Sequence, residues 1–378
     1  MADLILRGGT VIDPASNFEG VADLAVEDGR ISAIGPDLKG SMSTRIIDVH
    51  GQYVVPGLID LHAHVYRGGT AMGCNVDIDC LRKGVTTTVD GGSAGAANYG
   101  GLRDWVIYNA QSRVLAFINL SAIGLTDVRV GELMNQAYVD AEGAVRTIRE
   151  HPTQVIGIKV RCSDYVIGGP AGPLVDLARQ AADETGTRLM CHIGQTVEPL
   201  PDLLKHLKPG DIITHCLTGA RHNLLDENGQ VHGAVREAVE FGIIFDGAHG
   251  RMHFHWDVTQ RLLDQGFTPQ VISTDLSAPS VHGPVFDLPT TMTKLLALGA
   301  PFREIVRWTT SNPAAVLGRS EEIGALAVGR AADVAVLQIH DEPATLVDSY
   351  GQARQVQQQI KPHLVLRNGE AVAGTEGH

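Results

Sequence analysis

Two histidines separated by one residue follow an apolar run near residue 60. His62 and His64 end the segment 54–64, in which only Asp60 is charged. Side chains at positions i and i+2 of a strand point to the same face, so both imidazoles leave the strand tip in one direction. Two convergent neutral imidazoles can supply half of a zinc site. Two solvated histidines would give the same pattern, so the other polar residues must decide between the two interpretations.

Further polar residues stand at the ends of later apolar runs. Lys159 and Arg161 end the fourth run, His192 the fifth, His215 the sixth and Asp275 the eighth. A polar side chain at such a place is costly unless it is paired or bound. Taken alone, each residue is also compatible with a hydrogen-bonded polar side chain at the rim of the fold. Their recurrence in order along the chain favours a single metal site.

The middle of the chain alternates short apolar runs with helical patterns. Helical periodicity is clearest at 140–151 and 173–185. The predicted strands are 57–62, 86–90, 114–119, 155–160, 188–192, 211–215, 243–246 and 270–275. We therefore predict an α/β fold, and eight repeats favour a (β/α)8 TIM barrel over an open doubly wound sheet. Active-site residues of such barrels lie at the C-terminal strand ends, where these polar residues stand.

The two ends of the chain differ from its middle. Residues 3–49 alternate as short strands separated by glycine and aspartate turns, and strand patterns recur at 333–338 and 363–366. We predict a small β-sandwich-like domain built from residues 1–54 and 325–378. Residues 55–324 are then expected to form the barrel.

Composition argues against several classes of protein. The net charge of −13 is unfavourable for a nucleic-acid partner. No apolar run reaches the roughly 18 residues of a membrane span, and the N-terminus does not resemble a signal peptide. The five cysteines lack a CxxC pattern and are expected to be reduced thiols, which predicts a cytoplasmic location. Three of them lie near the proposed site and keep a ligand role open: Cys162, Cys191 and Cys216.

Together these motifs resemble the amidohydrolase superfamily of metal-dependent hydrolases over nearly the whole length. The resemblance includes Asn312-Pro313-Ala314 and the segment 324–333, which is similar to the superfamily's return into its small domain. It implies a centre of two divalent ions, and the ligand types favour Zn²⁺. The implied ligands are His62, His64 and Asp275 for one ion, His192 and His215 for the other, and Lys159, carboxylated by CO₂, as the bridge.

Elementary chemistry accounts for these residue types. An ammonium group has no lone pair, whereas a neutral buried lysine can add carbon dioxide and offer two carbamate oxygens. Two divalent ions about 3.5–4 Å apart can bridge one hydroxide and polarise a carbonyl. The implied reaction is hydrolysis of an ester or amide by that metal-bridged hydroxide, with Asp275 as general base and then general acid.

The surroundings of these motifs narrow the substrate class. Dihydroorotases carry HxHxR, whereas this chain has Tyr66 at the place of the arginine and Arg67 one residue later. The stretches 84–96, 157–161 and 287–292 instead resemble a dihydroorotase-related group of acetyl-ester and amide hydrolases. The expected substrate is small and carries a carboxylate, such as an acetylated α-hydroxy acid of the acetyl-(R)-mandelate type or an N-acetyl-D-amino acid derivative. The alternatives are a cyclic amidase of the dihydroorotase type, an N-acyl-D-amino-acid deacylase, or a non-enzymatic scaffold, against which the complete ligand set argues.

The predicted substrate contacts are Arg161, Tyr66 and His249. Arg161 shares a strand face with Lys159 and can hold a carboxylate, or it can form a salt bridge at the rim. Tyr66 can hydrogen-bond the substrate or form an aromatic wall, and His249 follows the seventh strand. The later loop histidines are expected to be solvated: His253, His255 and His282. The expected partner is a small-molecule substrate, with no nucleic acid and no membrane, and a homo-oligomer is compatible with the sequence.

Overall fold

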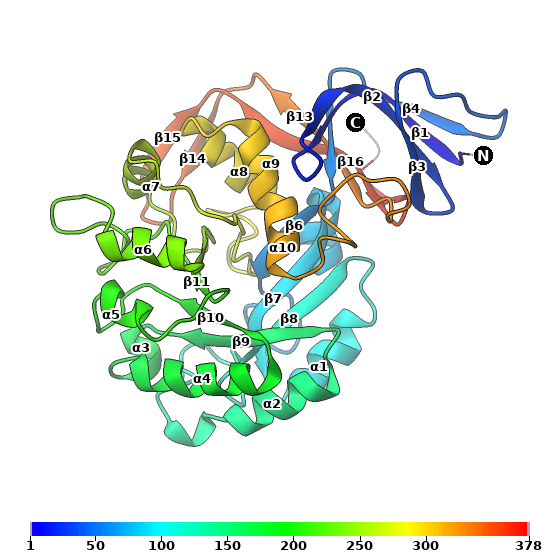
Figure 1. Cartoon of the computed structure of the whole chain (residues 1–378). Helices are drawn as coiled ribbons and strands as arrows, with labels where there is room; N and C mark the ends of the chain where they lie inside the picture. The colour runs from blue at the N-terminus through cyan, green and yellow to red at the C-terminus, as the bar shows by residue number, and fades with distance from the viewer. Residues whose placement is uncertain (1, 376–378) are drawn as a thin grey trace.

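A curled parallel sheet forms the centre of the computed structural model, which describes residues 2–375 (Figure 1). Its seven strands neighbour one another in sequence order. They are β6 (Leu58–Ala63), β7 (Val85–Gly95), β8 (Arg113–Asn119), β9 (Val155–Arg161), β10 (Arg188–His192), β11 (Ile212–Thr214) and β12 (Ile244–Asp246). Strand β7 is buried along its whole length, as expected for a parallel strand that is covered on both faces. The carboxyl ends of all these strands therefore meet on one side of the sheet.

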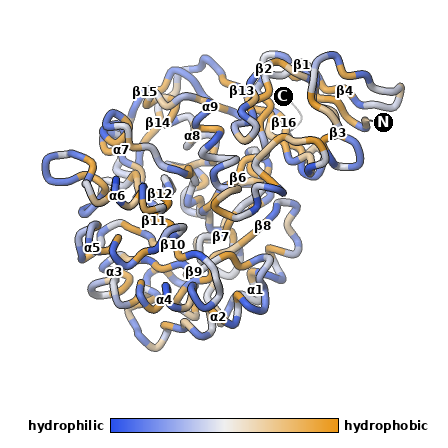
Figure 2. The backbone as a smooth tube through the Cα atoms, viewed as in Figure 1, coloured by the Kyte–Doolittle hydropathy of each residue, from blue (hydrophilic) through white to orange (hydrophobic). Residues whose placement is uncertain are grey.

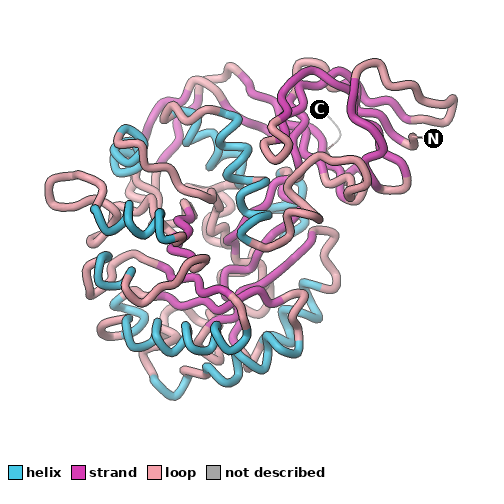
Figure 3. Tube along the Cα trace, in the orientation of Figure 1, coloured by secondary structure: helices cyan, strands magenta, loops and turns pink. Residues whose placement is uncertain are grey.

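Helices connect the strands and cover the outside of the sheet (Figure 3). Helix α2 (Ala141–Glu150) begins where the Asp140 side chain accepts a hydrogen bond from Gly143 N. Helix α4 (Gly172–Thr185) ends at Gly186, whose φ of 65° allows the left-handed C-terminal turn. Helix α2 packs against β8 and β9, and α4 packs against β9 and β10 (Figure 1). The other α-helices are α1 (Tyr99–Leu102), α3 (Asp164–Ile167), α5 (Leu200–Leu204), α6 (Gly233–Phe241), α7 (Trp256–Asp264), α8 (Leu288–Ala297), α9 (Phe302–Thr309) and α10 (Ser311–Val316).

The segment 270–275 is not the regular eighth strand that the sequence predicts. It makes isolated parallel bridges instead, from Val271 to Asp246 of β12 and from Leu276 to Ala63 of β6. The Asp60 carboxylate accepts the Thr274 N–H, so a side chain takes the place of a strand partner. Asp275 has a φ of 48°, which interrupts extended backbone. The segment therefore lies between the two edge strands of the curled sheet without forming a continuous ladder.

Strands from both ends of the chain form a second sheet. Its eight strands have the order β17-β16-β13-β5-β1-β2-β3, with β4 paired to β1. They are β1 (Leu4–Asp13), β2 (Phe18–Glu27), β3 (Arg30–Gly35), β4 (Arg45–Asp48), β5 (Tyr53–Pro56), β13 (Val334–His340), β16 (Gln359–Arg367) and β17 (Glu370–Ala371). A separate hairpin joins β14 (Ala344–Val347) to β15 (Ala353–Val356). The two chain ends thus share one sheet, and the domain boundaries at residues 54 and 325 stay a prediction.

The distribution of apolar residues follows this arrangement. Figure 2 shows hydrophobic residues concentrated on the strands and a hydrophilic loop beside α6. All five cysteines are buried as free thiols. Within the described part of the chain, no helix has both the length and the apolar character that a membrane crossing requires.

Candidate metal centre and active site

The end of β6 brings His62 and His64 against Asp275. Asp275 Oδ1 lies 3.0 Å from His64 Nε2 and 3.6 Å from His62 Nε2. One donor atom from each residue falls within 4.8 Å of the others, so together they can hold a metal ion. We call these three residues the first donor group. The alternation along β6 therefore has the effect predicted from the sequence, since both rings reach one carboxylate.

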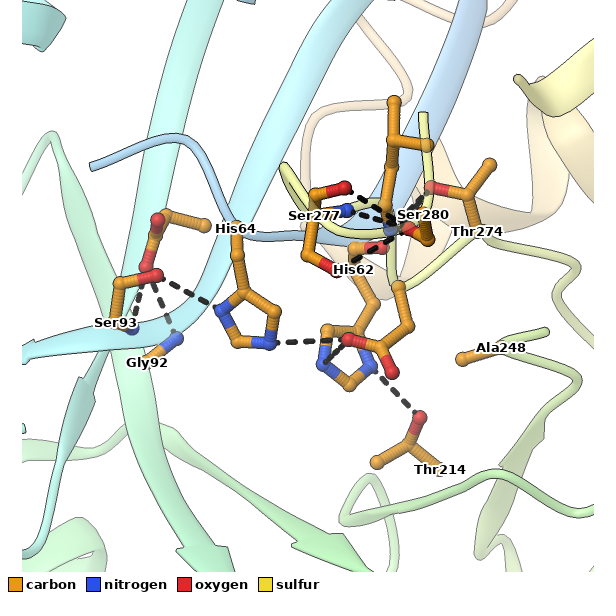
Figure 4. A network of polar contacts seen from close by, with 12 residues as sticks. His62, His64, Gly92, Ser93, Thr214, Ala248, Thr274, Ser277 and Ser280 are labelled. Atoms are coloured by element: carbon orange, nitrogen blue, oxygen red, sulfur yellow. Dashed lines mark hydrogen bonds and ion pairs between the residues drawn. The ribbon is translucent and has the colours of Figure 1, made fainter. Parts of the chain in front are cut away.

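Each imidazole of the first donor group is oriented through its other nitrogen. His62 Nδ1 lies 2.9 Å from Thr214 Oγ1, and His64 Nδ1 lies 2.8 Å from Ser93 Oγ (Figure 4). The Thr214 hydroxyl donates its proton to Asp246, so it must accept from His62 Nδ1–H. His62 Nε2 is therefore the unprotonated nitrogen with the lone pair that a metal requires. Such outer contacts orient metal-binding histidines in general.

Three further imidazoles form a second group. His192 and His215 stand at the ends of β10 and β11, and His253 comes from the loop between β12 and α7. The ring centroids lie 4.4 Å apart for His192 and His215, 4.7 Å for His192 and His253, and 3.9 Å for His215 and His253. One nitrogen of each ring is available within 4.8 Å of the others. We call these residues the second donor group.

The nitrogens of the second donor group are buried and lack partners. His192 Nε2, His215 Nε2 and His253 Nδ1 have no hydrogen-bond partner in the described structure. Burial lowers the pKa values of His192 and His215 well below the ordinary value for histidine and that of His253 to about 4. All three rings are therefore neutral near pH 7, with lone pairs for a cation. Buried polar atoms without partners are uncommon, so these three nitrogens require a partner that the described structure does not supply.

Lys159, at the end of β9, lies beside the first donor group. Its Nζ is 3.0 Å from His62 Nε2 and 3.3 Å from Met190 Sδ. Burial lowers the pKa of its amine to about 8, so a neutral form is accessible. Two glycines of β7 leave space here: a Cβ on Gly91 would meet the His62 ring at 2.1 Å, and one on Gly92 would meet Lys159 Cβ at 2.7 Å. The glycine-rich segment of β7 therefore makes room for these side chains.

Asp275 and His215 share an unusual backbone conformation. Their φ values are 48° and 73°, in the left-handed region that residues other than glycine rarely occupy. Such a conformation costs on the order of 1–3 kcal/mol and tends to occur at functional sites. Although burial raises the pKa of the Asp275 carboxyl, the hydrogen bond and charge of His64 contribute to lowering it overall. Asp275 is therefore an ionised carboxylate in contact with the His64 ring.

A cavity of about 800 Å³ opens onto both donor groups. Its walls include His62, His64, Lys159, His192, His253 and Asp275, whereas His215 lies behind them in contact with His192 and His253. The other lining residues include Met72, Leu125, Val128, Tyr165, Gln195, Arg251, Met252, Ser277 and Ser349. The predicted ligands thus lie around one space large enough for a small molecule.

Arg161 lines this cavity and is also part of an ion pair. Its Nη1 donates to Glu132 at 3.1 Å, and its Nη2 donates to the Tyr165 hydroxyl at 3.1 Å. Glu132 is only 1% exposed, so a buried carboxylate balances the charge of the arginine. The salt bridge that the sequence analysis allowed is therefore present, and the contact of Arg161 with a substrate carboxylate stays a prediction.

The structure does not bring the other two predicted substrate contacts to the cavity. Tyr66 is 3% exposed and donates its hydroxyl to Asn98 O at 3.0 Å, so it packs under the neighbouring loop. His249 is fully buried, stacks on Phe254 and contacts Lys294 Nζ through Nε2 at 2.7 Å. Neither residue is among those that line the cavity.

Sequence reasoning missed two residues of the site. His253 was expected to be a solvated loop histidine, but the loop folds inward and leaves it 7% exposed, so that expectation is wrong. Glu132 lies in the segment after β8 and carries no strand-end pattern. The available signal for His253 was the density of histidines in 249–255, where His249, His253 and His255 follow the seventh strand.

Comparison with known proteins places the chain in a family. A model described as the amidohydrolase family matches residues 248–372. A deacetylase of Agrobacterium fabrum is 34% identical over 349 residues, which cover 92% of this chain and 86% of that protein. The chain belongs to the amidohydrolase family. This amidohydrolase is accordingly a hydrolase of a superfamily whose members use metal ions.

Two solved structures extend the likeness across the fold. A crystal structure described as an adenine deaminase superposes with a TM-score of 0.90 at 31% identity, over 98% of this chain and 99% of the other. A crystal structure described as a dihydroorotase superposes with a TM-score of 0.89 at 32% identity, over 97% of this chain and 98% of the other. The similarity therefore includes both sheets of the amidohydrolase as well as the segment around the donor groups.

Proposed function

We propose that this amidohydrolase cleaves the ester or amide bond of a small acylated carboxylic acid. The preferred substrates are acetylated α-hydroxy acids of the acetyl-(R)-mandelate type or N-acetyl-D-amino acid derivatives. The observation that carries the proposal is one cavity that contains buried imidazole donors, the Asp275 carboxylate and the Arg161 guanidinium together. The similarity to a protein named deacetylase supports acyl transfer to water as the reaction.

The donor atoms fit two divalent metal ions. We propose that the first donor group holds one ion, that His192 and His215 hold the other, and that Lys159 lies between them as a carbamate. Imidazole and carboxylate ligands favour Zn²⁺. The neutral amine of Lys159 adds CO₂, a C–N bond forms and one proton is released, so the product is an anion with two oxygen donors. Bound ions would polarise the scissile carbonyl and activate water.

Asp275 then acts as the proton carrier. Its Oδ1 contacts His64, and Gly250 leaves the other oxygen uncovered, since a Cβ there would meet Asp275 Oδ2 at 2.4 Å. An ionised carboxylate at this point can accept the proton of the attacking water and deliver it to the departing alkoxide or amine. Asp275 lines the cavity in which the substrate would bind, so one carboxylate can serve both transfers.

Arg161 orients the substrate. Arg161 Nη1 donates to Glu132, and Arg161 Nη2 donates to the Tyr165 hydroxyl. A guanidinium has five N–H donors in total. The remaining donors can hold the carboxylate of the substrate with its acyl group toward the donor groups. Glu132 already balances the charge of Arg161. The arginine therefore orients the substrate through hydrogen bonds more than it attracts the substrate over a long distance.

A kinetic panel tests this proposal. Both enantiomers of acetyl-mandelate, N-acetyl-D- and N-acetyl-L-amino acids, and the cyclic amides dihydroorotate and hydantoin should be compared by kcat/KM. We expect the acetylated acids to be the best substrates, with a clear preference for one enantiomer. Faster hydrolysis of the cyclic amides would support the cyclic amidase instead. A protein that retains less than one divalent ion per chain and hydrolyses none of them would contradict the enzymatic proposal.

A further inference from the structure

His253 stands in the site without an assigned role. Its ring stacks on His215 with an interplanar angle of 28° and meets His192 edge to face at 87°. Its Nδ1 is buried and has no hydrogen-bond partner in the described structure. A buried neutral imidazole normally finds a donor or acceptor for both nitrogens, because leaving one unpaired costs about 1–3 kcal/mol. The ring is therefore placed for a contact that the protein alone does not supply.

Two glycines give the His253 ring its position. A Cβ on Gly194 would lie 3.0 Å from His253 Nδ1, and a Cβ on Gly250 would lie 3.1 Å from its Cδ2. Gly194 has a φ of 138°, a conformation that L side chains rarely adopt. The chain thus keeps side chains away from this ring on two sides.

The loop 249–255 that carries His253 is fastened at several points. Phe254 N donates to Ser349 Oγ at 3.1 Å, and Ser349 Oγ donates to Gly250 O at 2.8 Å. His255 N donates to Leu217 O at 3.0 Å. At the start of the loop, Lys294 Nζ holds the buried His249. These contacts fasten the loop at its start and at its end, on both sides of His253.

We propose that His253 is a metal ligand and that the loop 249–255 supplies a third imidazole to the ion held by His192 and His215. The inference rests on the metal centre of the proposed function. Two observations carry it. Each of the three rings has a buried nitrogen without a hydrogen-bond partner in the described structure, and the three rings can offer one nitrogen each within 4.8 Å of the others. One cation satisfies all three lone pairs, whereas a hydrogen bond from a substrate would satisfy one.

This assignment makes the two ions chemically unequal. The first donor group includes a carboxylate, whereas the second consists of neutral imidazoles alone. Imidazole ligands suit Zn²⁺, Co²⁺, Ni²⁺ and Cu²⁺ and discriminate against Mg²⁺ and Ca²⁺. The second ion should therefore be the more selective of the two.

The test removes the lone pairs of His253 and keeps its shape. His253→Phe retains a ring that can stack on His215, and His253→Ala removes the ring entirely. His282→Ala is the matched control, because His282 is an exposed histidine outside the cavity lining. For each purified protein, metal content, the rate of zinc loss to a chelator, and the visible spectrum of the Co²⁺-loaded form are measured. Circular dichroism confirms that each variant is folded.

We expect both His253 variants to keep one tightly held ion and to release the other at least about 10- to 100-fold faster than the wild type. The Co²⁺ spectrum should change in intensity, because a ligand is lost, and His282→Ala should match the wild type throughout. If folded His253→Phe holds both ions as tightly as the control, with only KM or kcat altered, His253 contacts substrate and the inference is wrong. If the wild type itself binds no divalent ion, the proposed function fails first.

Discussion

The two donor groups at the floor of the cavity are built in different ways. The first combines two residues of a single strand with Asp275, and hydroxyl groups fix both rings from behind. The second gathers rings from two strand ends and a loop, contains no carboxylate and leaves three buried nitrogens without partners in the described structure. Both face the same cavity, although His215 lies behind its wall.

The difference concerns what holds each group in place. The first donor group is complete by itself, since a negative carboxylate already contacts its imidazoles and each ring is oriented by a hydrogen bond. The second leaves lone pairs unused, at a cost of about 1–3 kcal/mol each. The protein's own contacts thus satisfy both rings of the first group, whereas the second group leaves buried nitrogens for a contact that the described structure does not supply.

The largest effect is expected from Asp275→Asn, which tests the chemical role of the first group. An amide cannot accept a proton as a carboxylate does, so kcat should fall by about 10²–10⁴-fold while the fold is retained. Turnover on the best substrate of the panel, with metal analysis and circular dichroism on the same sample, measures this. Near-normal turnover in the folded, metal-loaded variant would remove Asp275 from the mechanism.

A smaller effect is expected when the His64 ring loses the hydrogen bond that orients it. Ser93→Ala deletes the hydroxyl that holds His64 Nδ1. Loss of such an outer contact should weaken binding of the ion at the first donor group by about 10–100-fold and leave the second group unchanged. Zinc competition against a coloured chelator resolves the two ions. Ser277→Ala, at the cavity wall, is the control, and equal weakening of both ions would show that the two groups are not independent.

The smallest effect concerns the support of the second group. Burial lowers the pKa of Lys294 to about 7 from its ordinary value of 10.5. Between these values the unfolded chain binds more protons than the folded one, so the free energy of unfolding should rise with pH, by at most about 1.4 kcal/mol per unit. Lys294→Met should remove this contribution to the slope.

Urea unfolding at about pH 7 and about pH 9 measures this slope in the wild type and in Lys294→Met. The exposed Lys205, replaced by Met, serves as the control, since its side chain is 73% exposed. An unchanged slope in Lys294→Met would mean that Lys294 keeps its charge in the folded protein and fastens the loop as an ammonium.

The strand-end residues were the predictable part of the site. His62, His192 and Asp275 follow apolar runs, and the carboxyl ends of parallel strands meet on one side of a sheet, so their proximity follows from local pattern and topology. The irregular segment 270–275 was less predictable. The sequence pattern there is that of a strand, but the Asp60 side chain takes the place of a ladder partner and Asp275 adopts a positive φ.

The loop residues were decided by the tertiary structure. Whether a histidine in a loop is solvated or buried depends on where distant segments lie, as the Ser349 contacts with the loop of His253 illustrate. The same holds for Tyr66, which packs under its own loop, and for Arg161, whose partner Glu132 lies 29 residues away in the chain. The α/β fold and the proximity of the strand-end side chains could be predicted from the sequence, because periodicity and strand order are local properties. Which loop side chains lie beside them could not be predicted, because that depends on contacts between segments that are far apart in the chain.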